Sequence, residues 1–223
     1  MKTIWRKYSE EEIKNRIFSA LKRNVNYQKQ QILGLPASYL DEKVFHQDAS
    51  FLKDAPYMST MVQNPNHIGC HTLGTSEPFF RGTQEIEREL IELVAVDILR
   101  GKQGEHDGYI ASGGTEANMQ AIWIYRNYFK RKFGAENRQI SILCSADNHY
   151  SMDKAANVLA VKIHKTSVDD ENRSIKENAL RTTLQHAWDA GIRYIVAVPT
   201  MMTTMFGSVD DIDLLVNTLE DFD

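Results

Sequence analysis

Residues 139–144 read Gln-Ile-Ser-Ile-Leu-Cys, and residues 194–198 read Tyr-Ile-Val-Ala-Val. Both runs are short and almost wholly apolar, which is typical of strands that are buried on both faces of a sheet. A third run, Ala-Val-Lys-Ile-His at 160–164, lies between them, and residues 108–111 add another short run. We interpret all four segments as strands.

Helical patterns alternate with these strands. Such alternation requires crossover connections, so it predicts a three-layer α/β fold in which helices cover both faces of a mostly parallel sheet. Ligands of such sheets bind beyond the carboxyl ends of the strands. The segments that leave those ends are 112–115, 145–151 and 199–208. The predicted helices span 116–133, 150–159, 178–190 and 211–220.

The N-terminal part of the chain differs in composition and does not show this alternation of strands and helices. Ser9 and Glu12 form a capping-box pattern, and the apolar spacing that follows predicts a helix over 10–31. Residues 33–81 hold four of the five prolines, which predicts short helices and loops in an arm.

A longer helix is predicted to begin near Thr83, which can cap it, and to close at Arg100. We therefore divide the chain between residues 82 and 83. Residues 1–82 are expected to be a helical arm, and residues 83–223 are expected to form the N-terminal part of an α/β domain.

Composition excludes several function classes. The 223 residues are 42 % hydrophobic and carry 30 acidic against 26 basic side chains, for a net charge of −4, so a nucleic-acid surface is not expected. No run approaches the roughly 18 uncharged apolar residues of a membrane span, and the N-terminus has no apolar signal core. Cys70 and Cys144 are too few for a disulfide framework. A cytoplasmic, reduced protein without membrane contact is the expectation.

The segment Ser-Gly-Gly-Thr-Glu-Ala-Asn at 112–118 lies between a predicted strand and a predicted helix. Glycines let an anion approach the backbone closely, hydroxyl groups add donors, and the amino end of a helix favours a phosphate. Neither the dinucleotide fingerprint nor the P-loop pattern is met. A tight turn capped by Thr115 is the structural alternative.

Two further motifs follow in order. Residues 149–155 read His-Tyr-Ser-Met-Asp-Lys-Ala, and residues 203–210 read Thr-Thr-Met-Phe-Gly-Ser-Val-Asp. With 112–118, this ordered set resembles the group II pyridoxal-5′-phosphate-dependent amino-acid decarboxylases, and 64–67 and 82–87 are also similar. The resemblance spans roughly residues 50–223. It implies an incomplete large domain like that of aspartate aminotransferase, preceded by a helical arm.

The resemblance also implies roles for single residues. Gly114 and Thr115 would donate to the cofactor phosphate, and Ser112 would lie nearby. His149 would stack over the pyridine ring as a catalytic residue and could hydrogen-bond the reacting carboxylate. Thr203 would touch the cofactor region. The alternatives are a surface-loop histidine and a loop threonine.

Other polar residues are interpreted more plainly. Met202 replaces the family's glycine, which weakens the third motif. Lys154 and Lys165 are expected to face solvent rather than to form a Schiff base. The run His-Ile-Gly-Cys-His at 67–71 lacks the usual zinc spacings, so no metal site is predicted. By the resemblance it lines the substrate side of the cleft with Phe79 and Phe80, whose alternative is ordinary core.

The implied activity is decarboxylation of an L-amino acid by the complete protein, acting as a homodimer whose arm wraps its partner. The family's Schiff-base lysine and the aspartate that pairs with the pyridine nitrogen have no match in residues 1–223. We therefore expect these residues to be the N-terminal part of such an enzyme and to be inactive alone. The alternatives are another pyridoxal-phosphate enzyme (a carbon–carbon lyase, desulfurase or aminotransferase), a non-catalytic binding or dimerising fragment, and an unrelated nucleotide-binding domain.

Overall fold

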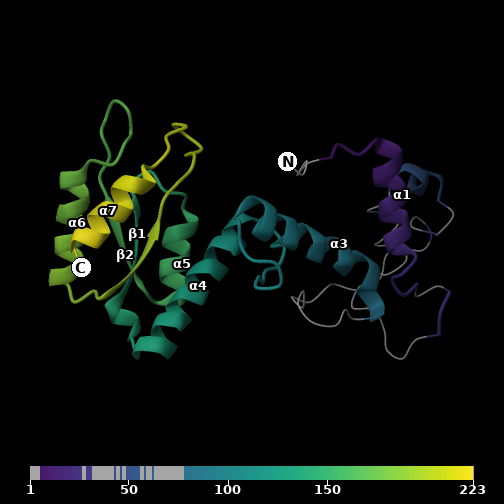
Figure 1. The fold of residues 1–223 in the computed structure, drawn as a ribbon, viewed down its shortest axis with the longest axis horizontal. Helices are drawn as coiled ribbons and strands as arrows, with labels where there is room; N and C mark the ends of the chain where they lie inside the picture. The colour runs from purple at the N-terminus through teal and green to yellow at the C-terminus, as the bar shows by residue number, and fades with distance from the viewer. Residues whose placement is uncertain are drawn as a thin grey trace. The chain divides into compact units, whose positions relative to one another are not determined.

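The computed structural model describes residues 6–26, 29–31, 43, 46, 49–55, 58, 62 and 78–222. The chain divides into two compact units, residues 1–110 and 111–223, which we describe separately (Figure 1). The predicted boundary between residues 82 and 83 stays a prediction. None of the helices in the described ranges has both the length and the apolar character that crossing a bilayer requires.

The first unit is built around two helices, α1 and α3, that pack against each other. A π-helical turn, η3, continues α3, and two short 3-10 helices, η1 and η2, lie between α1 and α3 in the sequence. The bounds are α1 Glu10–Leu21, η1 Ser50–Asp54, η2 Pro78–Phe80, α3 Arg81–Glu92 and η3 Leu93–Ile98.

Helix α1 begins as the capping box predicts but ends earlier than expected. The Ser9 hydroxyl accepts from the Glu12 amide at 3.2 Å, and the Glu12 carboxylate accepts from the Ser9 amide at 2.8 Å. The prediction of one helix over 10–31 is wrong, because the helix ends at Leu21. Three residues later the buried Asn24 side chain turns to a different partner, the amino end of α3.

Asn24 supplies the cap that we had assigned to Thr83. Its Oδ1 accepts from the Gly82 amide at 2.8 Å and from the Thr83 amide at 3.2 Å, and its Nδ2 donates to the Thr83 hydroxyl at 3.1 Å. Helix α3 therefore begins at Arg81 rather than near Thr83. A cap that comes from 58 residues away in the sequence leaves no local pattern.

Gly82 fixes how closely α1 and α3 approach. A Cβ atom on Gly82 would lie 1.8 Å from the carbonyl oxygen of Ala20, a distance that no side chain tolerates. Ion pairs of Arg16 with Glu89, and of Arg23 with Glu85, join the exposed sides of the same two helices.

The second unit contains a fully parallel sheet in the order β2-β1-β3. Each strand lies within two residues of a predicted strand, and β3 matches its predicted range. In the register, Ile142 of β1 is paired with Ile163 of β2 and Val196 of β3. The bounds are β1 Ile140–Ser145, β2 Lys162–Thr166, β3 Tyr194–Val198, α4 Gly114–Phe133, α5 Ser151–Leu159, α6 Glu177–Asp189 and α7 Ile212–Phe222.

The fourth predicted strand, at 108–111, is wrong. These residues are described but form no strand. Their backbone amides bond to side chains instead of to a neighbouring strand: Gly108 donates to Asp107 at 2.6 Å, and Ile110 donates to Glu87 at 2.8 Å.

Helices cover both faces of the sheet, as predicted (Figure 1). The step from β1 to β2 and the step from β2 to β3 run in opposite directions across the sheet. Right-handed crossovers then place the connecting helices α5 and α6 on opposite faces. Helix α4 packs on the α5 side, and α7 packs beside α6.

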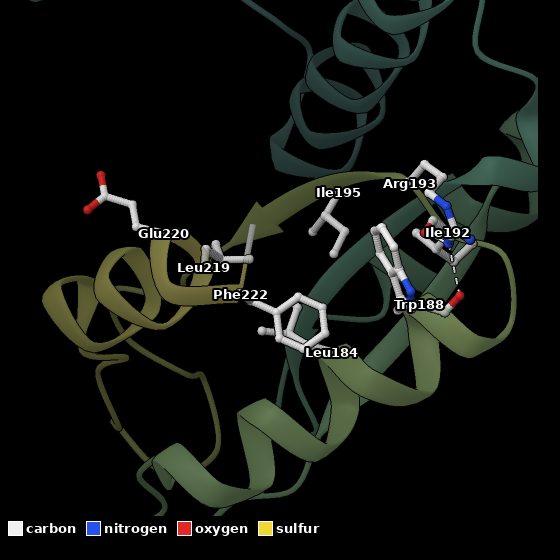
Figure 2. A pocket seen from close by; sticks show the side chains of 8 residues that line it. All are labelled: Leu184, Trp188, Ile192, Arg193, Ile195, Leu219, Glu220 and Phe222. Carbon is white, nitrogen blue, oxygen red and sulfur yellow. Dashed lines mark hydrogen bonds between the residues drawn. The ribbon is translucent and has the colours of Figure 1, made fainter.

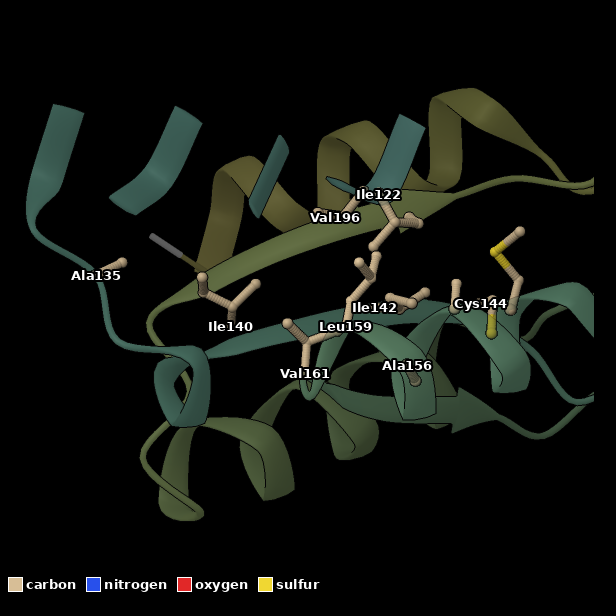
Figure 3. Packing of buried hydrophobic residues seen from close by; sticks show 11 residues of the cluster. Ile122, Ala135, Ile140, Ile142, Cys144, Ala156, Leu159, Val161 and Val196 are labelled. Atoms are coloured by element: carbon tan, nitrogen blue, oxygen red, sulfur yellow. The ribbon is translucent and has the colours of Figure 1, made fainter. Parts of the chain in front are cut away.

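The core follows the alternation of side chains along β1. Ile140, Ile142 and Cys144 belong to the cluster that α4 and α5 complete, and Figure 3 shows Ile122 of α4 over Ile142. Leu143 points the other way, into a second cluster made with α6 and α7. Every residue of β1 is buried, so this strand is the centre of the unit.

Replacing Gly82 by alanine tests the α1–α3 contact. The new Cβ would force the two backbones apart, at a cost of about 1–3 kcal/mol in the free energy of unfolding of the first unit. We expect the amides of α1 to exchange hydrogen with solvent about tenfold faster or more. Arg81→Ala, at the exposed neighbouring position, is the matched control. Equal exchange in both variants would contradict the packing described.

Candidate functional site

The candidate site residues lie where the chain leaves the carboxyl ends of β1 and β3. The loop after β1 carries His149, and the loop after β3 carries Thr203. The two strands are neighbours, and the helices that follow them, α5 and α7, lie on opposite faces. In parallel α/β sheets, this reversal marks the point where ligands bind.

The amino end of α4 is open. The helix begins at Gly114, two residues earlier than predicted, so Gly114 and Thr115 form its first turn. A Cβ atom placed on Gly113 or Gly114 would meet no described atom within 4 Å. The first amides of a helix have no partner within it, and the dipole of this 20-residue helix favours an anion there.

Ser112 is already hydrogen-bonded to the side chain of Glu116. Its amide and its hydroxyl both donate to the Glu116 carboxylate, at 2.9 and 2.5 Å. The hydroxyl has only one proton, so it can donate to an anion only if this bond opens. A phosphate role for Ser112 stays a prediction.

Two contacts bring the amino end of α4 to the loop after β1. The Thr115 and Tyr150 hydroxyl groups lie 3.4 Å apart. One turn further along α4, the Asn118 amide donates to the hydroxyl of Ser151 at 2.8 Å. Ser151 is fully buried, and the bond therefore fixes the start of α5 against α4.

Ser151 in turn orients His149. The Ser151 amide donates to His149 Nδ1 at 3.3 Å, and the Ser151 hydroxyl lies 2.9 Å from the same nitrogen. A backbone amide can only donate, so the Nδ1 atom that faces the Ser151 amide presents its lone pair. His149 Nδ1 is then an acceptor, so the neutral ring carries its proton on Nε2.

Tyr150 was not singled out from the sequence, although it lies within the second motif. Its ring centroid is 4.2 Å from that of His149, and Lys154 Nζ lies 5.3 Å from the Tyr150 centroid. Lys154 is exposed, as expected. Lys165 is also exposed but pairs with Asp153 at 2.7 Å.

The Thr203 side chain is buried, and its hydrogen bonds are made within its own loop. Its hydroxyl lies 2.9 Å from that of Ser208 and accepts from the Ser208 amide at 3.2 Å. Asp210 closes the base of the loop, accepting from the Thr200 amide at 2.8 Å. Burial raises the pKa of the Asp210 carboxyl above its ordinary value. Within the described residues, no hydrogen bond joins Thr203 to α4 or His149, and its cofactor role stays a prediction.

Unsatisfied polar atoms gather under these loops. The side-chain oxygens of Ser145, Thr166 and Asn148 are buried without a hydrogen-bond partner among the described atoms. Ser145 and Thr166 are paired in register at the carboxyl ends of β1 and β2. Cys144 lies beside them, and burial raises the pKa of its thiol to about 12, so it is neutral at physiological pH.

An apolar pocket of about 320 Å³ lies elsewhere in this unit (Figure 2). It lies against Ile195 of β3 and is bounded by α6 and α7. Arg193 stacks over Trp188 with its guanidinium 3.9 Å from the ring centroid. Arg193 precedes β3, so this pocket lies toward the amino end of that strand, away from the loops described above.

The segment 67–71, which the resemblance places on the substrate side of the cleft, lies outside the described residues.

Taken together, the sheet and loops define an α/β protein with an open helix amino end beside an oriented histidine. The sequence matches the family described as "Pyridoxal-dependent decarboxylase conserved domain" over residues 83–223. The chain therefore belongs to the pyridoxal-dependent decarboxylase family.

Known proteins agree with this assignment. The chain is 46 % identical over 219 residues to a tryptophan decarboxylase of Clostridium sporogenes, covering 98 % of this chain and 52 % of that protein. It is 40 % identical over 129 residues to a probable L-aspartate decarboxylase of Archaeoglobus fulgidus, covering 53 % of this chain and 33 % of that protein. The chain thus spans about half the length, or less, of these curated relatives.

A solved structure supports the fold. The glutamate decarboxylase domain of a Vibrio parahaemolyticus protein superposes with a TM-score of 0.57 at 15 % identity, covering 97 % of this chain and 57 % of that one. The predicted fold, part of an aspartate-aminotransferase-like large domain, is confirmed. At this identity the likeness shows the fold alone.

The family's cofactor fits the described residues. The open helix end at Gly114 and Thr115 suits a phosphate, whose oxygens would take the amides that the helix leaves without partners. His149 presents a flat ring whose Nε2–H makes no described hydrogen bond. The orphaned oxygens of Ser145 and Thr166 mark the same edge of the sheet as polar.

The proton position on His149 is directly measurable. We expect the nitrogen resonances of ¹⁵N-histidine-labelled protein to show the Nε2–H tautomer for the neutral ring of His149. Ser151→Ala should weaken this preference, because one of the two donors to Nδ1 is lost. His149→Gln assigns the signals, and an Nδ1–H tautomer in the wild type would contradict the geometry.

Proposed function

We propose that the whole protein is a pyridoxal-phosphate-dependent decarboxylase of an L-amino acid. The observation that carries this proposal is the joining of the open α4 amino end to the His149 segment, through Thr115–Tyr150 and Asn118–Ser151, in a chain of this family. A phosphate-binding element and a ring-stacking element are thereby held at one edge of the sheet.

Each residue then has a stated task. Gly114 and Thr115 hold the cofactor phosphate through their amides and the Thr115 hydroxyl. His149 stacks on the pyridine ring, and its Nε2–H donates to the substrate carboxylate. When bound, pyridoxal phosphate supplies the electron sink for the pair of electrons left on the α-carbon after carbon dioxide departs. Ser151 and Asn118 keep the imidazole in the orientation that this task requires.

We further propose an aromatic substrate, L-tryptophan. The support is the 46 % identity to the tryptophan decarboxylase, which extends over nearly the whole of this chain, whereas the match to the probable aspartate decarboxylase covers about half of it. Release of carbon dioxide from carboxyl-labelled L-tryptophan but not from L-aspartate, by the whole protein, is the expected result. The opposite preference would overturn this substrate assignment.

Two measurements separate the competing interpretations: the mass of a reduced cofactor adduct and the release of carbon dioxide. Borohydride reduction of the whole protein with pyridoxal phosphate should leave one covalent cofactor adduct, measured by mass spectrometry. A non-catalytic binding fragment or a nucleotide-binding domain would show no specific adduct. Another enzyme of this cofactor class would show the adduct but release no carbon dioxide.

We also propose that the whole protein is a homodimer that acts on its substrate in the cytoplasm. The N-terminal arm is the expected dimer contact, by likeness to the family. Sedimentation of the whole protein as a monomer would count against this assembly.

His149→Ala separates catalysis from cofactor binding. We expect decarboxylation by the whole protein to fall by at least about 100-fold, since a positioned donor to the reacting group is lost. Cofactor affinity should fall by less than about tenfold, because the phosphate contacts remain. His186→Ala, at an exposed histidine of α6, is the control. Unchanged decarboxylation by the His149 variant would rule out its role.

Thr115→Val tests the phosphate contact. Valine preserves the shape of threonine but removes the hydroxyl, so the dissociation constant for pyridoxal 5′-phosphate should rise about tenfold. Titration followed by the visible absorbance of the bound cofactor measures it. Thr182→Val, at an exposed threonine of α6, should leave the constant unchanged. An equal constant in both variants would contradict phosphate binding by Thr115.

A further inference from the structure

Arg173 connects three loops that leave the same edge of the sheet. It lies in the loop between β2 and α6. Its guanidinium donates twice to the Asp147 carboxylate in the loop after β1, at 2.8 and 2.5 Å. The same guanidinium stacks on the Phe206 ring in the loop after β3, 4.4 Å from the ring centroid. We call Asp147, Arg173 and Phe206 the loop clasp.

The clasp reaches both loops that carry candidate site residues. Asp147 precedes His149 by two residues, and Phe206 lies within the Thr203–Ser208 turn. Hydrogen bonds tie Thr203 to Ser208 but not, in the described part of the chain, to the His149 loop. Arg173 therefore contacts both loops at once.

The chemistry of the clasp suits a fixed geometry. Two parallel N–H···O bonds between a guanidinium and a carboxylate define both a distance and a plane, which a lysine cannot do. The Asp147 side chain is only 9 % exposed and that of Arg173 is 24 % exposed, so solvent screens the pair weakly. The hydrogen bonds to Asp147 raise the pKa of the Arg173 guanidinium above its ordinary value.

The backbone of Arg173 points to a role for its side chain. Its φ of 60° lies in the left-handed region, where glycine is the favoured residue. No glycine stands in this loop between residues 167 and 176. The contacts of its side chain with Asp147 and Phe206 give a reason for an arginine at this position.

We propose that Arg173 is a positioning residue of the cofactor site: through Asp147 it holds the His149 loop, and through Phe206 it holds the Thr203 loop at a fixed distance from it. The inference rests on the proposed function, because the geometry that it preserves is that of the cofactor-binding loops. Arg173 itself touches neither the open end of α4 nor His149 among the described contacts.

The test compares variants of the whole protein by their affinity for pyridoxal 5′-phosphate and by the circular dichroism of the bound cofactor. Arg173→Gly removes the side chain while relieving the left-handed backbone, so the fold is spared that cost. We expect the dissociation constant to rise about tenfold and the visible dichroism band to shrink. Arg173→Lys should recover less than half of the lost dichroism, since it keeps the charge without the paired bonds.

A double-variant cycle separates positioning from general stability. Because Arg173 acts in part through the His149 loop, Arg173→Gly should weaken affinity by a smaller factor in a His149→Ala background than in the wild type. A merely structural role would cost the same factor in both backgrounds and would overturn the proposal. Arg181→Ala is the control, because Arg181 also pairs with two carboxylates, Glu177 and Asp221, but in α6 and α7 away from the loops.

Failure of the inference and failure of the proposed function are distinguishable. A wild-type protein that binds no pyridoxal 5′-phosphate would overturn both. A wild type that binds it, with Arg173→Gly binding equally well and with an equal dichroism band, would overturn the loop clasp alone. A loss of affinity that Arg181→Ala reproduces would also overturn it.

Discussion

The hydrogen bond from Asn118 to Ser151 is the contact on which the candidate site depends. It joins α4, whose amino end is open, to the start of α5, two residues after His149. The amide of Ser151 donates to His149 Nδ1, which leaves the Nε2–H available. The Asn118–Ser151 bond thus sets the distance between two helices, and Ser151 links it to the orientation of the His149 ring.

The parallel sheet makes that contact possible. Helices α4 and α5 share the face of β1 that carries Ile140, Ile142 and Cys144 (Figure 3). Contacts between Thr115 and Tyr150 and between Asn118 and Ser151 then hold their amino ends together. The reversal of direction after β2 sends α6 to the opposite face. The loops after β1 and β3 are therefore left side by side without a helix between them, and the loop clasp joins them.

The sequence predicted those structural features that depend on residues close together in the chain. The buried strand at Tyr194–Val198 and the Ser9 capping box were predictable, because burial on both faces and a cap three residues away both leave marks in the sequence. The cap of α3 by Asn24 and the clasp at Arg173 were not, since their partners are distant in the sequence. The motifs contained Asn118 and Ser151, but only the packing of α4 on α5 gave these residues their roles.

Family membership and fold do not by themselves select the reaction. The cofactor carries the chemistry in this class of enzyme, and the orientation of the bound substrate selects the bond that breaks. Residues that fix orientation therefore matter as much as those that touch the cofactor. Arg173 stands where glycine would be easier on the backbone, and its side chain fixes two loops at once. Backbone strain such as that of Arg173 is expected near a binding site whose side chains must be held in a precise position. Under the proposed function, the side chain held in this way is the ring of His149.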